Sequence, residues 1–549
     1  MQSIGSKEEK LMTGAQAMVK CLENEGISKV FGYPGVAIAP FYEGLYNSDI
    51  EHILVRQEQS AGHAASGYAR ISRKPAVCVV TSGPGATNLI TALATAYADS
   101  IPLIAISGQV SSKQLGRDVF QEADMRGATR SFVKHSYLVK DPDDIPRVFK
   151  EAFYIVSTGR KGPVLIDIPM DVQSAELKKQ FDYPDQVFIR GYKPEIKINM
   201  IQLRKVVNLL GQSKKPLLCA GGGVILSSGE DVIRGFCEKF NIPLVHTMMG
   251  MGVLPKKHPL NFGMLGNNGK PYANKAVGKA DLLIVVGARI ADRAIPKPEN
   301  LTRRAVIHID IDTAEIGKNM GPTIPLVGDL KEIFALMMDE SIPAAEQSWI
   351  DELEEIKHDT VDTRVFSDAH VNPNLLVQTL SEKMDDDAIY VADVGQNQLW
   401  SADNYIMKEG RFMTTGGMGT MGYSIPAAMG AKMFCPDKQT VAVCGDGAFQ
   451  MCMNELATMR ANDVDLKILI VRNGYLGLVR EYQYNLYDGH YEGVKLCDWP
   501  LYDKIAEAYG INYFECSSNE ELDEKLDAFL GSAGASLMVC DVDAENRVK

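Results

Sequence analysis

Two apolar segments in the last third of the chain each run into polar residues that could do chemistry. Thr440–Cys444 leads into the tripeptide Gly445–Gly447, which reads Gly-Asp-Gly, and Lys467–Val471 leads to Asn473. Both segments have the length and apolar composition of buried strands, and the pattern over Met451–Arg460 predicts a helix between them. Such a unit places the carboxyl ends of two parallel strands at one edge of a sheet, where open α/β sheets bind ligands.

The residue types at this edge suit a divalent cation that holds a diphosphate. Mg²⁺ prefers oxygen ligands and combines one or two protein groups with phosphate oxygens. Asp446 offers a carboxylate, Asn473 an amide oxygen, and Tyr475 in the following loop a backbone carbonyl. Gly-Asp-Gly alone would indicate only a turn, so the paired asparagine and the two flanking strands carry the prediction.

The main chain next to the acidic residue is suited to the phosphates themselves. Gly445 and Gly447 lack side chains, and Ala448 follows them at the predicted start of a helix. Main-chain N–H groups at a helix N-terminus can therefore approach a diphosphate closely.

A second candidate for chemistry, Glu58, follows the short apolar run Ile53–Val55 near the start of the chain. This position puts its carboxyl group at a predicted strand end. A carboxyl group buried against an apolar ring has a raised pKa, as a group that transfers protons requires. Taken alone, Glu58 could equally be a solvated surface carboxylate.

The composition indicates a soluble globular protein. The chain has 549 residues, 46% of them apolar, and a net charge of −13, which argues against a nucleic-acid partner. Its ten cysteines include no C-x-x-C pair, which favours reduced thiols and a cytoplasmic protein. The first ten residues hold no apolar signal segment, and runs such as Leu282–Val286 are too short to span a bilayer.

Helical and strand patterns alternate along the whole chain. Ala76–Val80, Leu103–Ser107 and Val164–Ile168 are apolar without polar alternation, and helical patterns separate them. Such strands are typical of parallel sheets that helices cover on both faces. The expected fold class is therefore α/β, with doubly wound parallel sheets.

Two polar stretches divide the chain into three such blocks. Lys178–Asn199 is polar and contains prolines, as linkers do, and Glu346–Asp362 is a charged segment of helical pattern. We expect three domains, at residues 1–180, 195–345 and 370–549.

Asp446 and Asn473 are 27 positions apart (473 − 446), which is similar to the spacing of the metal-binding motif in thiamine-diphosphate enzymes. Val55–Ala61 also matches the segment of that family that carries a glutamate. Further segments resemble the catalytic subunits of the acetolactate (acetohydroxyacid) synthase family, and the resemblance covers nearly the whole chain. These segments are Ala64–Arg70, Thr81–Asn88, Phe120–Asp124, Gly416–Gly422 and Asn454–Thr458.

The resemblance implies thiamine diphosphate and Mg²⁺ as cofactors. The first domain would bind the pyrimidine ring, the central domain FAD or another nucleotide, and the last domain the diphosphate and metal. Glu58 would hydrogen-bond the pyrimidine nitrogen and favour the imino tautomer that deprotonates thiazolium C2. Met421 would wedge the cofactor into its bent form, Gly419 would offer its carbonyl to the amino group, and Gln396 and Asn397 would contact the diphosphate.

The implied reaction transfers a group from one 2-oxo acid to another, which makes the protein a transferase. Pyruvate would be decarboxylated to a hydroxyethyl-enamine that attacks a second 2-oxo acid, so that two pyruvates give 2-acetolactate and CO₂. The cofactor supplies the electron sink, and the protein supplies position and a dry site. The pathway would be branched-chain amino acid biosynthesis or an acetoin-type route. Gln121 would lie near the reacting centre, unless it is an ordinary surface glutamine.

The central block resembles the FAD-binding domain of the family, in which FAD performs no redox step, while related domains bind ADP or nothing. Glycines and an acidic group at strand ends suit a dinucleotide, although three consecutive glycines alone are weak evidence. The candidate FAD-binding residues are Gly221, Gly222, Gly223, Thr247, Met248, Leu265, Gly266, Gly287, Arg289, Asp310, Ile311, Gly328 and Asp329.

Five residues are candidates for substrate contacts. Arg293 matches an arginine that the family places near the second substrate, where a guanidinium would pair with a carboxylate; otherwise it forms a surface salt bridge. Val36, Met170 and Tyr482 replace the usual glycine, lysine and tryptophan near the substrate channel, and with Phe120 they should influence which acids react.

Two other functions stay open from the sequence. One is a simple 2-oxo acid decarboxylase, or a carboligase with a different acceptor. The other is a non-catalytic nucleotide-binding subunit, against which the intact Glu58, Asp446 and Asn473 argue. The resemblance also implies a homodimer or homotetramer whose active sites lie between subunits, a possible small regulatory subunit, and no nucleic-acid or membrane partner.

Overall fold

The computed structural model describes residues 11–295, 305–319, 323–360, 364, 366–367, 369–497 and 500–548. Residues 1–10, on which the argument against a signal segment rests, lie outside the described residues, as do 361 and 362 at the end of the charged segment. The chain forms two compact units, Met1–Tyr192 and Lys193–Lys549. The boundary falls inside the stretch 178–199, which contains no helix or strand.

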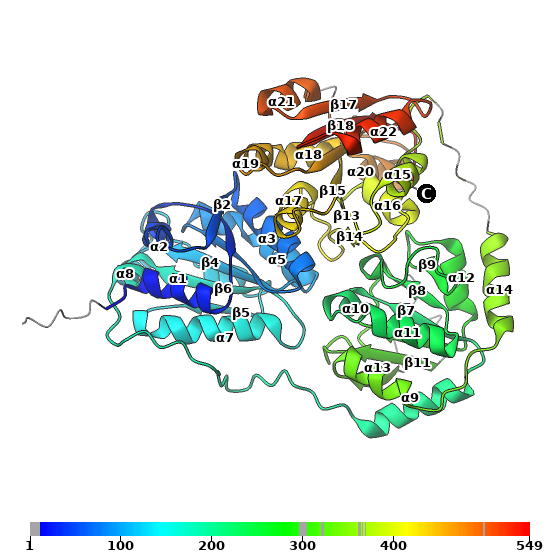
Figure 1. The fold of residues 1–549 in the computed structure, drawn as a ribbon, viewed down its shortest axis with the longest axis horizontal. Helices are drawn as coiled ribbons and strands as arrows, with labels where there is room; N and C mark the ends of the chain where they lie inside the picture. Colours follow the sequence, from blue (N-terminus) through cyan, green and yellow to red (C-terminus); the bar gives the residue numbers. More distant parts are fainter. Residues whose placement is uncertain are drawn as a thin grey trace, which may run out of the picture. The chain divides into compact units, whose positions relative to one another are not determined.

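The first unit is built around one six-stranded parallel sheet of order β2-β1-β3-β4-β6-β5 (Figure 1). Its central strands β3, β4 and β6 are buried along their whole length, because helices cover both faces. The strands are β1 (Lys29–Tyr33), β2 (Glu51–Leu54), β3 (Ala76–Val80), β4 (Leu103–Gln109), β5 (His135–Leu138) and β6 (Val164–Pro169).

The helices of this unit fall into two groups. Helices α1, α2 and α7 pack together, and α3 packs with α5 against β1 and β3. The helices are α1 (Gly14–Asn24), α2 (Ala39–Leu45), α3 (Glu58–Ser72), α4 (Pro84–Asn88), α5 (Ile90–Ala98), α6 (Met125–Thr129), α7 (Ile145–Ser157) and α8 (Met170–Ser174), with short 3₁₀ turns η1 (Val36–Ile38), η2 (Ser112–Gln114) and η3 (Pro142–Asp144).

The second unit contains two further six-stranded parallel sheets. The central sheet has the order β12-β11-β10-β7-β8-β9 and its own apolar core, which includes Trp349. Its strands are β7 (Pro216–Ala220), β8 (Leu244–His246), β9 (Asn261–Met264), β10 (Leu282–Val286), β11 (Ala305–Asp310) and β12 (Thr323–Val327). Its helices are α9 (Met200–Gln212), α10 (Gly222–Leu226), α11 (Glu230–Phe240), α12 (Pro271–Lys279), α13 (Leu330–Met338) and α14 (Gln347–His358), with η4 (Met248–Gly250).

The last sheet has the order β14-β13-β15-β16-β18-β17 and a separate core around Trp400. Its strands are β13 (Ile389–Ala392), β14 (Arg411–Met413), β15 (Thr440–Gly445), β16 (Lys467–Arg472), β17 (Asn512–Cys516) and β18 (Ser536–Asp541). Its helices are α15 (Pro373–Lys383), α16 (Gln396–Asn404), α17 (Ser424–Phe434), α18 (Asp446–Cys452), α19 (Leu456–Ala461), α20 (Gly477–Leu486), α21 (Tyr502–Tyr509) and α22 (Leu522–Gly531), with η6 (Met453–Glu455).

The predicted α/β class with three doubly wound parallel sheets is confirmed. One predicted element is wrong in its bounds. The helix expected over Met451–Arg460 begins at Asp446 and is interrupted by the 3₁₀ turn at Met453–Glu455 before α19. The helix can begin directly after β15 because Gly445 adopts an extended conformation at the N-cap. Asp446 therefore lies in the first turn of a helix rather than in a loop.

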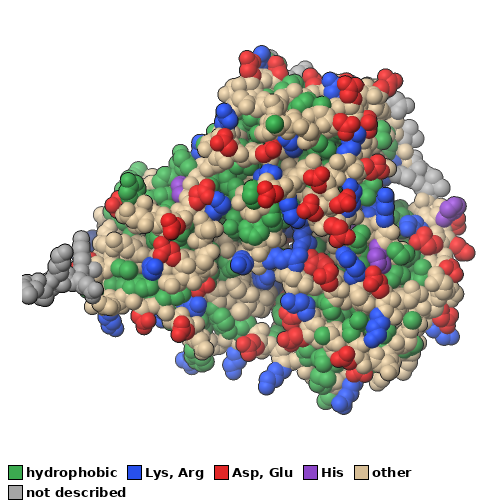
Figure 2. Space-filling model, in the orientation of Figure 1, with side chains coloured by type: hydrophobic (Ala, Val, Ile, Leu, Met, Phe, Trp, Pro, Cys, Tyr) green, Lys and Arg blue, Asp and Glu red, His purple; other side chains and the backbone are tan. Residues whose placement is uncertain are grey.

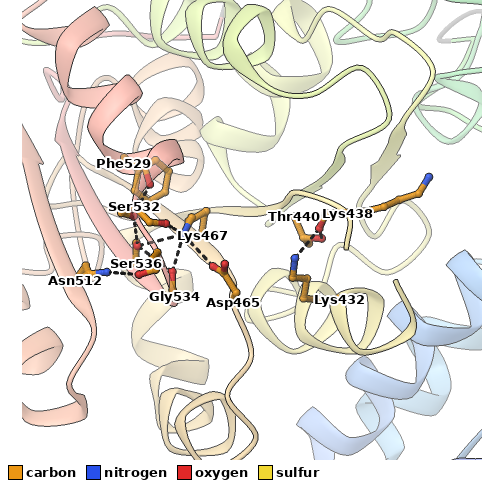
Figure 3. A network of polar contacts seen from close by, with 11 residues as sticks. Lys432, Lys438, Thr440, Asp465, Lys467, Asn512, Phe529, Ser532, Gly534 and Ser536 are labelled. Carbon is orange, nitrogen blue, oxygen red and sulfur yellow. Dashed lines mark hydrogen bonds and ion pairs between the residues drawn. The ribbon is translucent and has the colours of Figure 1, made fainter. Parts of the chain in front are cut away.

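A buried lysine ties together the amino ends of β16 and β18, at the edge opposite the loop of Asp446 (Figure 3). The ammonium group of Lys467 donates to the carbonyls of Ser532 and Gly534, each at 2.6 Å, and to Asp465 Oδ1 at 2.9 Å. Its side chain is only 6% exposed, so all three N–H donors need such partners. The lysine thereby fixes the turn that joins α22 to β18.

The surface and the cysteines agree with the composition. Acidic and basic side chains are interspersed over the face in Figure 2. All ten cysteines are free, and eight of them are buried. Among the described residues, no helix combines the length and the apolar character needed to cross a bilayer.

Candidate active site

The candidate cofactor residues of the last sheet gather at its carboxyl edge, where the strand order reverses between β13 and β15. Gln396 and Asn397 begin α16 just after β13, and Asp446 begins α18 at the end of β15. Asn473 follows β16, which pairs with β15 in parallel. Such a reversal point is where doubly wound sheets bind ligands.

Asp446 is held rigidly by two main-chain donors. Its Oδ1 accepts from the N–H of Gly447 at 3.0 Å, and its Oδ2 accepts from the N–H of Gly474 at 2.7 Å. Gly474 has a φ of +72°, which favours glycine in this turn. Burial raises the pKa of Asp446 to about 6, although the N–H donors oppose this rise. The predicted approach of the Asp446 and Asn473 loops is therefore present.

Asn473 turns its oxygen and its NH₂ group to different partners. Its Oδ1 accepts from the N–H of Tyr475 at 3.0 Å, and its Nδ2 donates to Gln396 Oε1 at 3.1 Å. The N–H groups of Leu476 and Leu496 bond across to the facing segment on either side of Tyr475. The carbonyl of Tyr475 therefore points away from that segment.

Gln396 lies against the first residue of α20. A Cβ atom at Gly477 would stand 1.9 Å from Gln396 Oε1, so glycine is required there. Asn397 is also buried, and its Nδ2 donates to the Val443 carbonyl at 2.9 Å, while its Oδ1 has no hydrogen-bond partner among the described residues. Asn397 thus presents an acceptor, and a contact with a phosphate oxygen would need its amide to turn.

The segment of Gly419 and Met421 is anchored by Asp393, which the sequence analysis missed. Asp393 Oδ1 accepts from the N–H of Gly422 at 3.0 Å, and Oδ2 accepts from the N–H of Ser424 at 2.8 Å. Asp393 is fully buried, and burial raises its pKa. Its position directly after β13, like that of Asp446 after β15, was the available signal. Gly419 itself has a φ of +66°.

Glu58 is the first residue of α3, close after the end of β2, and is half-buried. The side-chain amide of Asn88 donates to Glu58 Oε2 at 2.9 Å. Glu58 Oε1 lies 3.3 Å from where a Cβ of Gly85 would stand. The carboxyl group therefore lies at the carboxyl edge of the first sheet, as predicted, and Asn88 is a partner that the sequence analysis did not assign.

Gln121 lies beside the same loop. A Cβ at Gly83 would stand 2.9 Å from Gln121 Cβ, and Gln121 itself has a φ of +60°. Its segment is anchored by Gln109, whose Nε2 donates to the Ala123 carbonyl at 2.8 Å and to Asp167 Oδ2 at 3.0 Å. Burial raises the pKa of Asp167 to about 7, although hydrogen bonds from Ser107 and Gln109 oppose this rise.

The central sheet also reverses its strand order, between β7 and β10. Two loops come into contact there, the loop after β7 with Gly221–Gly223 and the loop after β10 with Gly287. A Cβ at Gly221 would stand 2.3 Å from the Gly287 carbonyl, and the N–H of Gly223 donates to that carbonyl at 2.9 Å. Gly221, Gly223 and Gly287 are therefore required by the contact between the two loops, whether or not a ligand lies over them, whereas a Cβ at Gly222 would meet Met249.

The remaining FAD candidates lie at the same carboxyl edge of the central sheet. Asp310 Oδ1 accepts from the N–H of Asp312, and Asp329 caps α13 through the N–H of Lys331. Arg289 is exposed. The others follow their strands in order: Thr247 and Met248 after β8, Leu265 and Gly266 after β9, Ile311 after β11, and Gly328 after β12.

Comparison with known proteins agrees with this arrangement. The chain matches three families: the N-terminal TPP binding domain of thiamine pyrophosphate enzymes over residues 12–128, their central domain over 203–337, and their C-terminal TPP binding domain over 393–541. It is 43% identical to a probable acetolactate synthase large subunit of Methanocaldococcus jannaschii, over 94% of this chain and 89% of the relative.

Two further relatives agree. The acetolactate synthase large subunit of Corynebacterium glutamicum is 43% identical over 93% of this chain and 83% of the relative. The acetolactate synthase of Mycobacterium bovis is 42% identical over 93% of this chain and 85% of the relative. The chain belongs to the acetolactate synthase family. It is a thiamine-diphosphate-dependent enzyme, as its motifs predicted.

Two of the substrate candidates meet in the second unit of this acetolactate synthase family member. The nearby side chain of Tyr482 raises the pKa of Arg293 above its ordinary value. Arg293 Nε also lies 3.6 Å from Asp292 Oδ2, and its side chain is 67% exposed, so the surface ion pair that the sequence left open is present.

The other three substrate candidates belong to the first unit. Val36 is 76% exposed and lines a groove of about 560 Å³ together with Pro34, Tyr42 and Tyr46. Phe120 is 87% exposed, and Met170 is the first residue of α8.

We expect the Asp167→Asn variant to gain stability relative to the parent protein as pH rises. The raised pKa means that folded Asp167 holds a proton between about pH 4 and pH 7 that the unfolded chain releases. The parent therefore loses unfolding free energy across this range, whereas asparagine does not ionise. Urea unfolding at pH 5 and pH 8 should show a relative change of roughly 2 kcal/mol.

The exposed Asp182→Asn variant serves as the control for this comparison. Its difference from the parent protein should stay constant with pH. An equally constant difference for Asp167→Asn would contradict a neutral buried carboxyl group.

We expect Gly445→Ala to weaken thiamine diphosphate binding without changing the cofactor-free fold. A Cβ there meets no atom within 4 Å, and the φ of −78° suits alanine. The methyl group would occupy space that a diphosphate needs, at a cost of about 1–3 kcal/mol, or roughly 5- to 100-fold in affinity. Titration in Mg²⁺, with Gly531→Ala as the control at another open position, measures this. Unchanged affinity would place the diphosphate elsewhere.

Proposed function

We propose that this protein forms 2-acetolactate from two molecules of pyruvate with release of CO₂. The observation that carries the proposal is the group of Asp446, Asn473 and Gln396 at the reversal point of the last sheet, in a chain whose relatives are named acetolactate synthases. An intact Glu58 at the edge of the first sheet supports catalysis rather than simple nucleotide binding.

The residues present fit a Mg²⁺-bound diphosphate. Asp446 Oδ, Asn473 Oδ1 and the Tyr475 carbonyl offer the hard oxygen ligands that Mg²⁺ takes, and the phosphates would complete its shell. Among the described residues, and apart from its chain neighbours, no atom lies within 4 Å of a Cβ at Gly445, so the start of α18, with the main-chain N–H of Ala448, would be open to the phosphates. The N–H groups of Gly447 and Gly474 already donate to Asp446 and would hold its carboxylate for the metal. Gln396 and Asn397 would flank the same diphosphate.

Bound thiamine diphosphate supplies an electron sink for the loss of CO₂. The side chains have separate tasks around it. Glu58, which Asn88 orients, would exchange a proton with the pyrimidine nitrogen. Met421 would support the bent shape of the cofactor, the Gly419 carbonyl would accept a hydrogen bond from its amino group, and Gln121 would lie at the reacting atoms.

The second 2-oxo acid would be recognised by its carboxylate. The Arg293 guanidinium offers paired N–H donors of the right geometry, and its contact with Tyr482 supports a fixed orientation. We assign Val36, Phe120 and Met170 to the apolar wall of the substrate channel. Because Met170 carries no charge, selection there would depend on size rather than on ion pairing.

We propose that the chain has three domains, at residues 1–180, 195–345 and 370–549. We further propose that the central domain binds FAD as a cofactor without a redox role. The reversal point between β7 and β10 supports this, because Rossmann-like sheets bind dinucleotides there. Purified protein should then absorb in the visible range and release free flavin on denaturation. Colourless protein that gains no visible absorption with added FAD would contradict the assignment.

We also propose that the protein is a homodimer, or a dimer of dimers, in the cytoplasm, with each active site built from Glu58 of one copy and the metal ligands of another. The family resemblance supports this arrangement. Several relatives are named large subunits, which supports a small regulatory partner for this chain as well.

We expect Glu58→Gln to reduce acetolactate formation from pyruvate by roughly 10²- to 10⁴-fold, because glutamine cannot exchange the proton. The assay separates acetolactate from free acetaldehyde, with and without 2-oxobutyrate. Aldehyde as the main product of the parent protein would identify a decarboxylase instead. Parental activity in Glu58→Gln would contradict its catalytic role.

The same variant tests the shared site. Mixed and refolded with inactive Asp446→Ala, Glu58→Gln should recover about a quarter of parental activity, since half of the dimers are mixed and each contains one intact site. A site made within one chain would recover none.

A further inference from the structure

Gln396 connects the candidate metal site to a buried carboxyl group that the proposed mechanism does not use. Its Nε2 donates to Glu481 Oε2 at 2.9 Å and to the Asn546 carbonyl at 3.2 Å. Its Oε1 accepts from Asn473 Nδ2 at 3.1 Å. Gln396 and Glu481 are 5% and 6% exposed, so these contacts form away from water.

Glu481 lies on α20 and is itself held by the last part of the chain. Its Oε2 also accepts from the N–H of Val548 at 3.0 Å. The neighbouring Arg480 donates to the Ala544 carbonyl at 2.5 Å and lies over the rings of Tyr475 and Tyr491. Gln396 and Val548 therefore hold the carboxyl group of Glu481, and Arg480 ties the same helix to the last part of the chain.

The polarity of these partners determines which way two side-chain amides face. The Asn546 carbonyl can only accept, and Glu481 Oε2 accepts from two N–H donors, so Gln396 must turn its NH₂ group toward them. The oxygen of Gln396 then faces Asn473, which must donate a hydrogen bond to it from its own NH₂ group. Asn473 Oδ1 is left on the opposite side, where the N–H of Tyr475 also requires an oxygen.

We propose that Glu481 is a positioning residue for the divalent cation, because it fixes the order of the two amides so that Asn473 presents oxygen to the metal. This inference rests on the proposed Mg²⁺–thiamine diphosphate site. Without an acceptor at position 481, Gln396 keeps only the longer bond to Asn546. A turned Gln396 amide would then oppose its NH₂ group to that of Asn473, and only the N–H of Tyr475 would still hold the Asn473 oxygen in place.

The test compares Mg²⁺ affinity in two variants of the full-length protein. Glu481→Met has a similar length but no acceptor, and Glu481→Gln keeps an acceptor oxygen. Isothermal titration of Mg²⁺ with a fixed excess of thiamine diphosphate should give about a fivefold higher Kd for Glu481→Met, the effect of losing about one hydrogen bond. Glu481→Gln should stay within about twofold of the parent protein. Glu524→Met on the exposed face of α22 controls for the loss of one charge.

A second background separates orientation from general damage. In Asn473→Asp the ligand is a carboxylate, which offers oxygen whichever way it turns. Adding Glu481→Met there should change the Kd for Mg²⁺ by less than about twofold. The same fivefold loss in both backgrounds, or no loss in the Asn473 background, would overturn the inference.

Two further results have defined meanings. Thermal melting of metal-free protein reports whether Glu481→Met folds. If it does not, Glu481→Asp replaces it, because its carboxyl group is one methylene too short to reach Gln396. The same limits on the change in Kd for Mg²⁺ then apply. A parent protein that binds no thiamine diphosphate in Mg²⁺ would refute the proposed function and this inference together. Normal parental binding with unaffected variants would refute the inference alone.

Discussion

The candidate site depends on the parallel pairing of β15 with β16. This pairing brings Gly445 level with Val471 and lets the N–H of Gly474 reach Asp446 Oδ2. A shift by one residue would turn each side chain to the other face of the sheet and separate the two oxygen ligands. At the opposite end of β16, Lys467 joins this strand to the turn before β18, so both ends of β16 are fixed by buried polar contacts.

The fold and the position of the candidate metal ligands at one sheet edge could be predicted because they depend on local patterns. Apolar runs without alternation predict buried parallel strands, and Gly-Asp-Gly directly after such a run places Asp446 at a strand end. Asp393, Asn88 and Glu481 were missed for a common reason: their partners lie 29 to 85 positions away in the chain. No pattern in one sequence relates Glu481 to Gln396, because that contact exists only after α20 has packed beside α16.

The central sheet shows a different limit of sequence reasoning. The sequence predicts an approach to a dinucleotide at Gly221, Gly223 and Gly287, yet each of these glycines is already required by the other loop. A glycine can be demanded by a neighbouring backbone or by a ligand, and the sequence is the same in both cases. The start of α18 was missed for a related reason. The sequence Gly-Asp-Gly is equally typical of a glycine turn and of a helix that begins at Asp446.

The double hydrogen bonding of Asp446 has a consequence for ion selection. Because each carboxylate oxygen already accepts a main-chain N–H, the group cannot swing to chelate an ion through both oxygens at once. Large ions such as Ca²⁺ often bind both oxygens of one carboxylate in a flexible geometry, whereas Mg²⁺ binds one oxygen of each ligand in a strict octahedral geometry. At the proposed metal site, a carboxylate held in this way would therefore favour Mg²⁺ over Ca²⁺ before any substrate has arrived.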